Sequence, residues 1–369
     1  MSDNRHKRVL RQGFTTGTAA AASAKAALMY LISQDRPEVV QVSLLNGETM
    51  NIPLDTVETD GSVCVATVIK DAGDDPDITH GARIGARVKL LPGAGNVRIS
   101  GGKGVGLVTK PGLEIPAGDP AINPGPRKMI RQSVEQVLTA YNRQDGVHVE
   151  IFVENGEILA KKTLNHRLGI EGGLSILGTT GRVKPLSHEA YTATIRSAMS
   201  VARACGAGHV VLTTGRRTEK YAQSFFPDLP EQTFIQIGDF FQMSMGYIAD
   251  QGFPQVTLSV FFGKALKMAQ GFPHTHAAKS GLIMDWLAGL AGEITGNKAL
   301  TGKISRANTA RHAFGMVYPK YPKVLEQVGF SMIRWALKFC NGATCVRAII
   351  FDFDGNVAFD SDNTQEQPQ

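Results

Sequence analysis

The sequence predicts an α+β N-terminal domain followed by an α/β domain with a mostly parallel, Rossmann-like wound sheet. The chain has 369 residues, which is too long for one typical domain core. Its first part combines a hairpin signal with a segment rich in Gly and Pro. After about residue 164, strands instead alternate with Gly-containing loops and helices. We therefore expect domains at 1–164 and 165–359 and a disordered polar tail at 360–369.

The first domain is expected to begin with a helix and to continue with strands. The residues Gly13-Phe14-Thr15-Thr16-Gly17-Thr18 precede an Ala-rich run that ends at Ile32, so one of the three threonines can cap this helix. The N–H groups of its first turn could bind an anion, although a plain capped helix explains the same residues. The next elements are strands at 39–45 and 48–52, which form a hairpin about Asn46-Gly47, and strands at 63–69 and 87–91.

Gly and Pro dominate residues 93–126, and this segment lacks a regular hydrophobic period. Long segments of this kind in compact proteins are usually functional or disordered. The basic residues within and just after it favour a ligand-facing role, and they are Lys103, Lys110, Arg127 and Lys128. A helix at about 127–141 and a strand at 147–153 are expected to complete the domain.

The second domain is predicted from four strands that each lead into a Gly-containing loop and then a helix. These strands are expected at 174–177, 209–212, 233–237 and 256–262. Such repeated units predict a largely parallel wound sheet with a crevice at the carboxyl ends of its strands. Later helices are expected at 278–291 and 321–340, with a strand at 348–351.

The ten residues from Asp71 to His80 contain four carboxylates and one imidazole, directly after the predicted strand at 63–69. Gly73 and Pro76 predict a turn. Carboxylates so close together repel one another unless something compensates them, so the segment is either a solvated acidic turn or part of a site. Its candidate catalytic residues are Asp71, Asp74, Asp75, Asp77 and His80.

The loop Gly178-Thr179-Thr180-Gly181 follows one predicted strand and precedes a helix. Open α/β sheets bind nucleotides or adenosyl groups at such loops, because glycine lets a ligand approach the backbone. The threonine hydroxyls can bond a carboxylate or a ribose. Asp239 ends a later strand and could accept hydrogen bonds from a ribose, or equally cap a helix. Gly215 and Gly263 lie in the corresponding loops of two other units.

Two familiar motifs are excluded. Residues 349–355 imitate the aspartyl-phosphate motif of haloacid-dehalogenase phosphatases, but too little chain follows to supply the other groups of that site. Residues 101–106 imitate a phosphate loop, but Lys103 precedes Gly rather than Ser or Thr. His274 and His276 alone are weak evidence for a metal, so no metal site is expected, and a substrate contact is preferred for His276.

The composition favours a cytoplasmic protein that binds an anionic small molecule. The net charge is +6, which attracts anions, but the aromatic content is 7% and no nucleic-acid-binding motif occurs. No apolar stretch is long enough to span a bilayer, and the four cysteines lack metal or disulfide spacing. We expect no nucleic-acid partner and no membrane, and a homo-oligomer stays open.

Taken together, these segments resemble the cobalt-precorrin-5B C(1)-methyltransferases of anaerobic cobalamin biosynthesis. The resemblance covers nearly the whole chain, in order. It depends on GFTTGTAAAASAKAA, KDAGDDPDITHG, GKGVGLVTKPGL, PAINPGPRKMI, KTLNHRLGIEGGLSILGTTGRVKP, TTGRR, IGDFF, GKALKMAQG, THAAKS and ANTARHA. Ala19 stands where many relatives are expected to carry cysteine, which indicates that no thiol is needed there.

The resemblance implies transfer of a methyl group from S-adenosylmethionine to carbon 1 of a cobalt-containing tetrapyrrole polycarboxylate, with cobalt carried by the substrate only. The expected donor-binding residues are Gly178, Thr179, Thr180, Gly181, Gly215, Asp239 and Gly263. The expected substrate-binding residues are Thr15, Thr16, Thr18, Lys103, Lys110, Arg127, Lys128, Asn165, Arg167 and His276. The alternatives are a non-catalytic tetrapyrrole carrier and, less favoured by the motifs, a basic nucleic-acid-binding protein.

Overall fold

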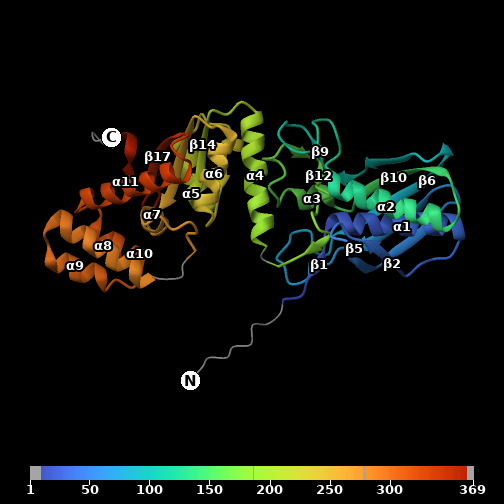
Figure 1. Cartoon of the computed structure of the whole chain (residues 1–369), viewed down its shortest axis with the longest axis horizontal. Helices are drawn as coiled ribbons and strands as arrows, with labels where there is room; N and C mark the ends of the chain where they lie inside the picture. Colours follow the sequence, from blue (N-terminus) through green and yellow to red (C-terminus); the bar gives the residue numbers. More distant parts are fainter. Residues whose placement is uncertain (1–9, 186, 277–279, 364–369) are drawn as a thin grey trace, which may run out of the picture. The chain divides into compact units, whose positions relative to one another are not determined.

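The computed structural model describes residues 10–185, 187–276 and 280–363, and the chain divides into two compact units (Figure 1). Unit 1 extends to His188 and unit 2 begins at Glu189. Both combine helices and sheets, which confirms the prediction of a mixed α/β protein.

The division between the units falls later than the boundary at 164/165 that the sequence predicts. Three short strands between these positions pair with strands of unit 1, which explains the difference. They are β11 (Ile170–Glu171) with β9 (Leu107–Val108), β12 (Gly173–Leu174) with β8 (Gly104–Val105), and β13 (Arg182–Val183) with β1 (Gly13–Phe14).

Unit 1 is built on a five-stranded sheet with the order β4-β5-β6-β10-β7. Its strands are β4 (Thr56–Thr59), β5 (Cys64–Ile69), β6 (Arg83–Ala94), β7 (Val97–Gly101) and β10 (Asp145–Val153). Neighbouring strands are antiparallel except β10 and β7, which run parallel. Part of the Gly- and Pro-rich segment at 93–126 therefore belongs to strands, because β7, β8 and β9 lie within it.

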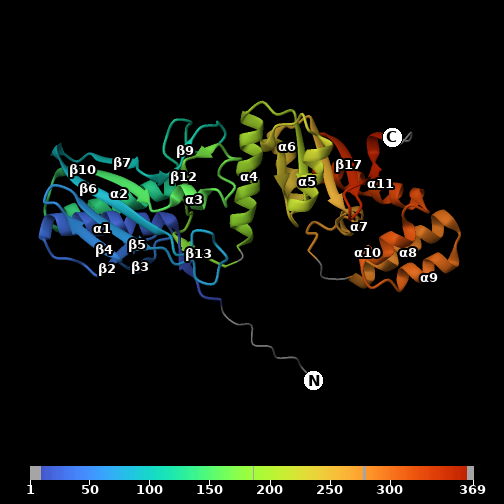
Figure 2. The ribbon, with the colours of Figure 1, turned by 180° about the vertical axis from the view of Figure 1, so that it is seen from behind.

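Two helices, α1 (Thr16–Ser33) and α2 (Pro124–Ala140), lie side by side against this sheet (Figures 1 and 2). The alanines of α1 are completely buried, and their small side chains let the helix approach β5 and β6 closely. The hairpin of β2 (Val39–Ser43) and β3 (Thr49–Pro53) matches the predicted one, and α3 (Gly156–Ala160) follows β10.

Unit 2 is built on a second five-stranded sheet with the order β15-β14-β16-β17-β18. Its strands are β14 (His209–Thr213), β15 (Phe234–Gln236), β16 (Gln255–Phe261), β17 (Cys345–Phe351) and β18 (Val357–Asp360). The first four are parallel, and β18 is antiparallel to β17.

Helices cover both faces of this second sheet. Alternate residues of a strand point to opposite faces, and Val211 packs with Ala222 of α5 (Arg216–Phe225) whereas Leu212 belongs to the main core. That main core contains residues of α4 (His188–Ala204), α6 (Phe241–Gln251), α7 (Phe262–Ala269) and α11 (Pro322–Phe339). The adjacent strands β14 and β16 therefore lead into helices on opposite faces.

Three further helices precede α11, namely α8 (Ser280–Thr295), α9 (Lys298–Ser305) and α10 (Ala310–Val317). The predicted helix at 278–291 corresponds to α8, and its first two positions lie outside the described residues. None of the helices in the described parts of the chain is both long and apolar enough to cross a bilayer.

The first residues of the expected polar tail belong to the folded unit. Asp360 ends β18, and its Oδ2 lies 2.6 Å from a guanidinium nitrogen of Arg347. A short 3-10 helix follows at Ser361–Asn363. The remaining tail positions, 364–369, lie outside the described residues.

Candidate functional site

In unit 1, the N-terminus of α1 lies between two loops that are far from it in sequence. The Phe14 N–H donates to the Asp71 carbonyl over 2.8 Å, at the start of the acidic loop. The Thr15 N–H donates to the Gly181 carbonyl over 3.0 Å, at the end of the predicted donor loop. The structure thus brings three of the predicted motifs together.

The predicted ligand-binding threonines of α1 are buried and bond to the protein. Thr15 caps the helix by accepting from the Thr18 N–H, and Thr18 Oγ1 donates to the Gly181 carbonyl over 2.8 Å. Thr16 Oγ1 accepts from the Leu177 N–H over 2.8 Å. The backbone N–H of Gly17, in the same first turn, also bonds to the protein, because it donates to the Leu177 carbonyl. The first turn of α1 therefore holds the 175–181 segment in place instead of offering the anion site considered from the sequence.

Gly178 lets the predicted donor loop approach α1. A Cβ at this position would lie 2.4 Å from Thr15 Oγ1, and the φ of 141° is one that residues with side chains rarely adopt. The loop differs from the expected strand–loop–helix unit, because β12 ends at Leu174 and the short strand β13 intervenes before α4. Thr179 is exposed, and Thr180 Oγ1 accepts from the Arg182 N–H over 3.3 Å.

The carboxylates of the acidic loop are compensated by two basic residues that the sequence analysis missed. Arg11 forms a bidentate ion pair with Asp71, and its own backbone N–H donates to Asp74 Oδ2 over 2.9 Å. Lys70 is 1% exposed, and its Nζ lies 2.7 Å from Asp77 Oδ2. Arg11 lies outside the quoted motifs and Lys70 is the first residue of KDAGDDPDITHG, and neither position by itself indicates an ion pair with the loop.

Two of these carboxylates are held ionised. Hydrogen bonds from Arg11, supported by the Gly73 N–H, lower the pKa of Asp71 below its ordinary value. Burial alone would raise the pKa of Asp77, but the charge of Lys70 and hydrogen bonds from Lys70 and Thr79 outweigh it and lower that pKa. A carboxylate with a lowered pKa is a weak proton acceptor, so both favour an electrostatic role over general-base catalysis.

His80 is bonded to the acidic loop through one ring nitrogen. Its Nδ1 accepts the Ala72 N–H over 3.1 Å, so the neutral ring carries its proton on Nε2. The side chain is 55% exposed, and Nδ1 lies 3.7 Å from Asp71 Oδ1. Asp74 is exposed and Asp75 half-buried on the same turn.

The other predicted substrate-binding residues of unit 1 are distributed over several segments. Asn165 is buried and donates from Nδ2 to the Gly173 carbonyl over 3.0 Å, while Arg127 donates from Nε to the Ile122 carbonyl over 2.9 Å. Lys103 and Lys128 are exposed. The half-buried side chains are Lys110 and Arg167.

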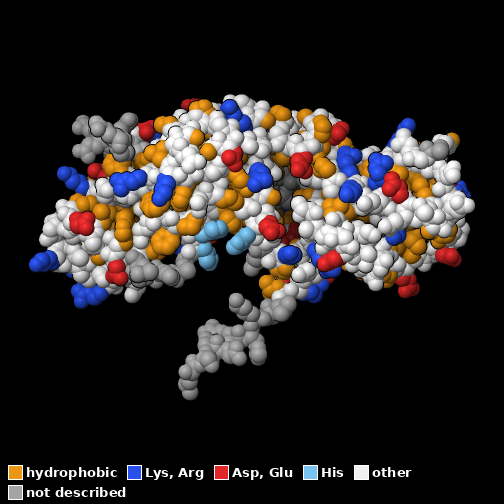
Figure 3. All heavy atoms as spheres, in the orientation of Figure 1, with side chains coloured by type: hydrophobic (Ala, Val, Ile, Leu, Met, Phe, Trp, Pro, Cys, Tyr) orange, Lys and Arg blue, Asp and Glu red, His pale blue; other side chains and the backbone are white. Residues whose placement is uncertain are grey.

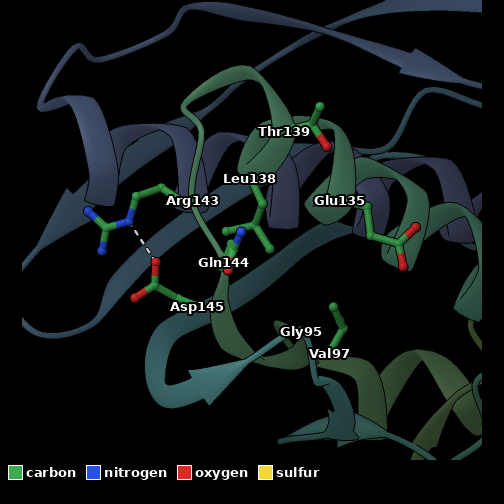
Figure 4. Close-up of a pocket in the computed structure, with 8 residues that line it drawn as sticks. All are labelled: Gly95, Val97, Glu135, Leu138, Thr139, Arg143, Gln144 and Asp145. Atoms are coloured by element: carbon green, nitrogen blue, oxygen red, sulfur yellow. Dashed lines mark hydrogen bonds and ion pairs between the residues drawn. The ribbon is translucent and has the colours of Figure 1, made fainter.

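A shallow pocket of about 330 Å³ lies at the C-terminal end of α2 (Figure 4). Arg143 and Asp145 pair at one side of it, and Glu135 lies on the other. The residues that line it include none of the predicted site residues. Arg143 and Asp145, which belong to the lining, already pair with each other. We do not assign a function to this pocket.

In unit 2, three predicted donor-binding residues lie at one edge of the parallel sheet. Gly215, Asp239 and Gly263 follow the carboxyl ends of β14, β15 and β16, respectively. Parallel strands bring their carboxyl ends to the same edge. The structure thus groups these three residues, whereas the Gly178–Gly181 loop belongs to unit 1.

Asp239 is the centre of a charged network. Its Oδ1 pairs with Lys264 Nζ and accepts from Thr275 Oγ1 over 3.0 Å, and its Oδ2 lies 3.4 Å from His276 Nδ1. Burial would raise the pKa of Asp239, but Lys264 and Thr275 outweigh it and lower that pKa. His276 is 83% exposed, so the side of the network near Oδ2 is open to solvent. Lys264 is not among the site residues predicted from the sequence, although it follows Gly263 directly.

Lys267 adds a second ammonium group to this network. Its Nζ donates to the Thr275 carbonyl over 2.8 Å, and burial together with repulsion from Lys264 lowers its pKa. Both lysines belong to α7. Among the residues that the structure describes, no group of three or more His, Cys, Asp or Glu could hold a metal ion.

Two buried hydroxyls mark the place where the helices change sides of the sheet. Thr213 of β14 and Ser259 of β16 are register partners, and both are completely buried. Within the described parts of the chain, neither hydroxyl oxygen has a hydrogen-bond partner. Ligands of open α/β sheets bind in the crevice at such a switch point.

Two family models match the chain. One is described as CbiD and matches residues 3–185, and the other is described as the CbiD C-terminal domain and matches residues 274–362. Together they reach both units.

Several curated proteins are similar to the chain over most of their length. Three of them are each named "Cobalt-precorrin-5B C(1)-methyltransferase". The protein of Priestia megaterium is 48% identical over 82% of this chain and 82% of its own. That of Nitratidesulfovibrio vulgaris is 44% identical over 85% and 83%, and that of Geobacillus kaustophilus is 43% identical over 95% and 94%. A solved structure titled cobalamin biosynthesis protein (cbiD), from Archaeoglobus fulgidus, is 30% identical, covers 69% of this chain and 78% of its own, and superposes with a TM-score of 0.39.

Proposed function

Because the chain belongs to the CbiD family, we propose that it methylates carbon 1 of cobalt-precorrin-5B, with S-adenosylmethionine as donor and cobalt-precorrin-6A as product. The observation that carries this proposal is the likeness to curated relatives over nearly the full length of both chains. The relatives' shared name specifies the substrate and the methylated carbon.

The charge of the protein suits this substrate. A tetrapyrrole of this class carries several acetate and propionate side chains, and the chain has a net charge of +6. Lys and Arg side chains are present over both units on the face shown in Figure 3. Each buried, charge-assisted contact to a carboxylate contributes roughly 1.5–3 kcal/mol.

We place the methyl donor at the carboxyl edge of the unit 2 sheet, which we take to be Rossmann-like. This placement is supported by the helices that follow β14 and β16, which cover opposite faces of the sheet. Gly215 and Gly263 follow the carboxyl ends of these two strands. Asp239 is the expected acceptor for the ribose hydroxyls, because its Oδ1 is occupied by Lys264 and Thr275, whereas the partner of Oδ2 among the described residues is the exposed His276. The Gly178–Gly181 loop of unit 1 stays the alternative proposed place for the donor.

We assign the acidic loop an electrostatic role in the reaction. The carboxylates of this loop would stabilise positive charge that develops on a bound substrate. Asp74 and His80 are exposed polar residues of the same loop, and Asp75 is half-buried. The exposed Lys103 and Lys128 are proposed to bind carboxylates, while Thr15, Thr16 and Thr18 would act by holding the loops in place.

The reaction needs little covalent participation by the protein. The sulfonium already activates the methyl group, and the electron-rich ring carbon already acts as the nucleophile. Holding the two in line can supply roughly 7–11 kcal/mol of barrier reduction. The protein's contribution is therefore orientation, exclusion of water and compensation of charge.

Mass spectrometry tests the proposal directly. Purified protein incubated with cobalt-precorrin-5B and S-adenosylmethionine should give a tetrapyrrole heavier by one methyl group, together with S-adenosylhomocysteine. Retention of an unmodified tetrapyrrole would instead identify a carrier, and no retention of either compound would refute both functions. The cytoplasmic location and a homo-oligomeric state stay predictions.

A further inference from the structure

Two exposed arginines lie on a pair of stacked phenylalanine rings in unit 2. Phe261 ends β16, and Phe353 follows β17 after one residue. Their ring centroids are 5.6 Å apart with an interplanar angle of 13°. The guanidinium carbon of Arg217 lies 5.1 Å from the Phe261 centroid, and that of Arg311 lies 4.8 Å from the Phe353 centroid.

Neither guanidinium pairs with a carboxylate among the described residues. Arg217 donates one N–H to the Phe353 carbonyl over 2.6 Å. The carboxylate of the neighbouring Asp352 bonds within the turn that follows β17. It accepts hydrogen bonds from the backbone N–H groups of Asp354 and Asn356 and from Asn356 Nδ2. Within the described parts of the chain, both positive charges therefore remain without a carboxylate partner.

We propose that Arg217 and Arg311, seated on the Phe261–Phe353 stack, form a carboxylate-binding site at the carboxyl ends of β16 and β17. Stacking on an aromatic face fixes the plane of a guanidinium while leaving its edge of N–H donors free. That edge matches the two oxygens of a carboxylate. Because the rings and the Phe353 carbonyl hold the donors in position, less side-chain freedom is lost when a ligand binds.

The position of the two arginines links this site to the proposed donor crevice. Arg217 is the second residue of α5, two positions after Gly215. Arg311 is the second residue of α10 and follows Ala310. Gly263 lies against Ala310, because a Cβ added to Gly263 would be 3.3 Å from the Ala310 Cβ. Both glycines border the crevice at β14 and β16.

The identity of the carboxylate rests on the proposed function. Two ligands of that reaction carry carboxylates, namely the tetrapyrrole at its periphery and the donor at its amino-acid end. Both would present the same planar group to the arginines. Probes with and without the carboxylate separate the two sources.

The test measures probe binding by calorimetry for the wild type, Arg217→Ala and Arg311→Ala. Arg334→Ala is the matched control, since Arg334 is an exposed arginine of α11 and its replacement removes the same charge. Cobyrinic acid and its methyl ester report on tetrapyrrole carboxylates, whereas S-adenosylhomocysteine and 5′-methylthioadenosine report on the donor carboxylate. Thermal unfolding of each variant checks the fold, and Arg217→Lys and Arg311→Lys replace any variant that unfolds.

Each alanine variant should bind one carboxylate-bearing probe at least tenfold more weakly, while the matching carboxylate-free probe and the control stay unchanged. Loss for cobyrinic acid identifies the tetrapyrrole as the source, and loss for S-adenosylhomocysteine identifies the donor. The lysine variants should give intermediate losses, because lysine keeps the charge but lacks the planar fork.

Wild-type affinity of both variants for both acids would overturn the site, as would a wild type that binds neither acid. This failure is distinct from failure of the proposed function. Normal methyl transfer with unaffected binding overturns only the arginine site. Conversely, no methyl transfer by the wild type, together with arginine-dependent binding of cobyrinic acid, overturns the enzyme and supports the site.

Discussion

The ammonium group of Lys70 lies 2.7 Å from Asp77 Oδ2 beneath the acidic loop of unit 1, and almost all of Lys70 is buried. This pair connects the end of β5 to the turn that carries the candidate catalytic residues. Asp77 Oδ1 accepts from both the N–H and the hydroxyl of Thr79, each over 2.8 Å. The loop is therefore a fixed structure with compensated charges.

Asp77→Asn should lower the free energy of unfolding by roughly 3–5 kcal/mol, because it leaves the Lys70 charge buried without its partner. The double variant Lys70→Met/Asp77→Asn should lose less than the sum of the two single losses. Urea unfolding of the four proteins measures this. Additive losses would show that the two residues stabilise the loop independently.

The acidic loop should also determine stability at low pH. Asp71 and Asp77 have lowered pKa values in the folded protein, so the unfolded chain binds more protons below the ordinary aspartate pKa of about 3.9. Their stabilisation is present above that pH and is lost as the pH falls through the lowered values. Urea unfolding as a function of pH should show a shallower acid decline for Asp77→Asn than for the wild type. Equal slopes would contradict the assignment.

Gly178→Ala should destabilise unit 1 by roughly 1–3 kcal/mol, because alanine is strained at this φ and its Cβ would collide with Thr15. Gly172→Ala is the control: Gly172 also has a positive φ, of 75°, but no atom lies within 4 Å of the place that a Cβ would occupy there. Thermal unfolding should show the larger loss for Gly178→Ala. The same loss in both variants would mean that the close approach to Thr15 has no energetic weight.

Asp239→Ala should weaken binding of S-adenosylhomocysteine at least tenfold, which corresponds to about 1.4 kcal/mol. The variant lacks the carboxylate that is proposed to accept hydrogen bonds from the ribose, and Lys264 loses its ion pair with Asp239. Calorimetry measures the change, with Asp250→Ala on the exposed side of α6 as the control. Unchanged affinity in Asp239→Ala would place the donor elsewhere.

The sequence predicts the strands of unit 2 well, because their apolar runs end at glycine-containing loops. The predicted strand at 209–212 is one residue shorter than β14, and the one at 256–262 is shifted by one residue from β16. As a result, the positions of Gly215 and Gly263 at one sheet edge could be anticipated.

The arrangement of unit 1 could not be anticipated in the same way. The loop at Gly178–Gly181 is held by Thr18, whose hydroxyl bonds to a residue 163 positions away. Local sequence contains no signal for such a contact. Likewise, nothing in the run before Asp71 indicates that Lys70 is buried, since an exposed lysine would fit the same pattern.

The most direct test of the central claim is ¹³C NMR of the tetrapyrrole after incubation with cobalt-precorrin-5B and S-adenosylmethionine labelled in its methyl group. Methyl transfer by this chain predicts one new labelled methyl resonance, which a proton-detected long-range correlation places on carbon 1 of the macrocycle. A tetrapyrrole without label, or one labelled at a different carbon, would contradict the account.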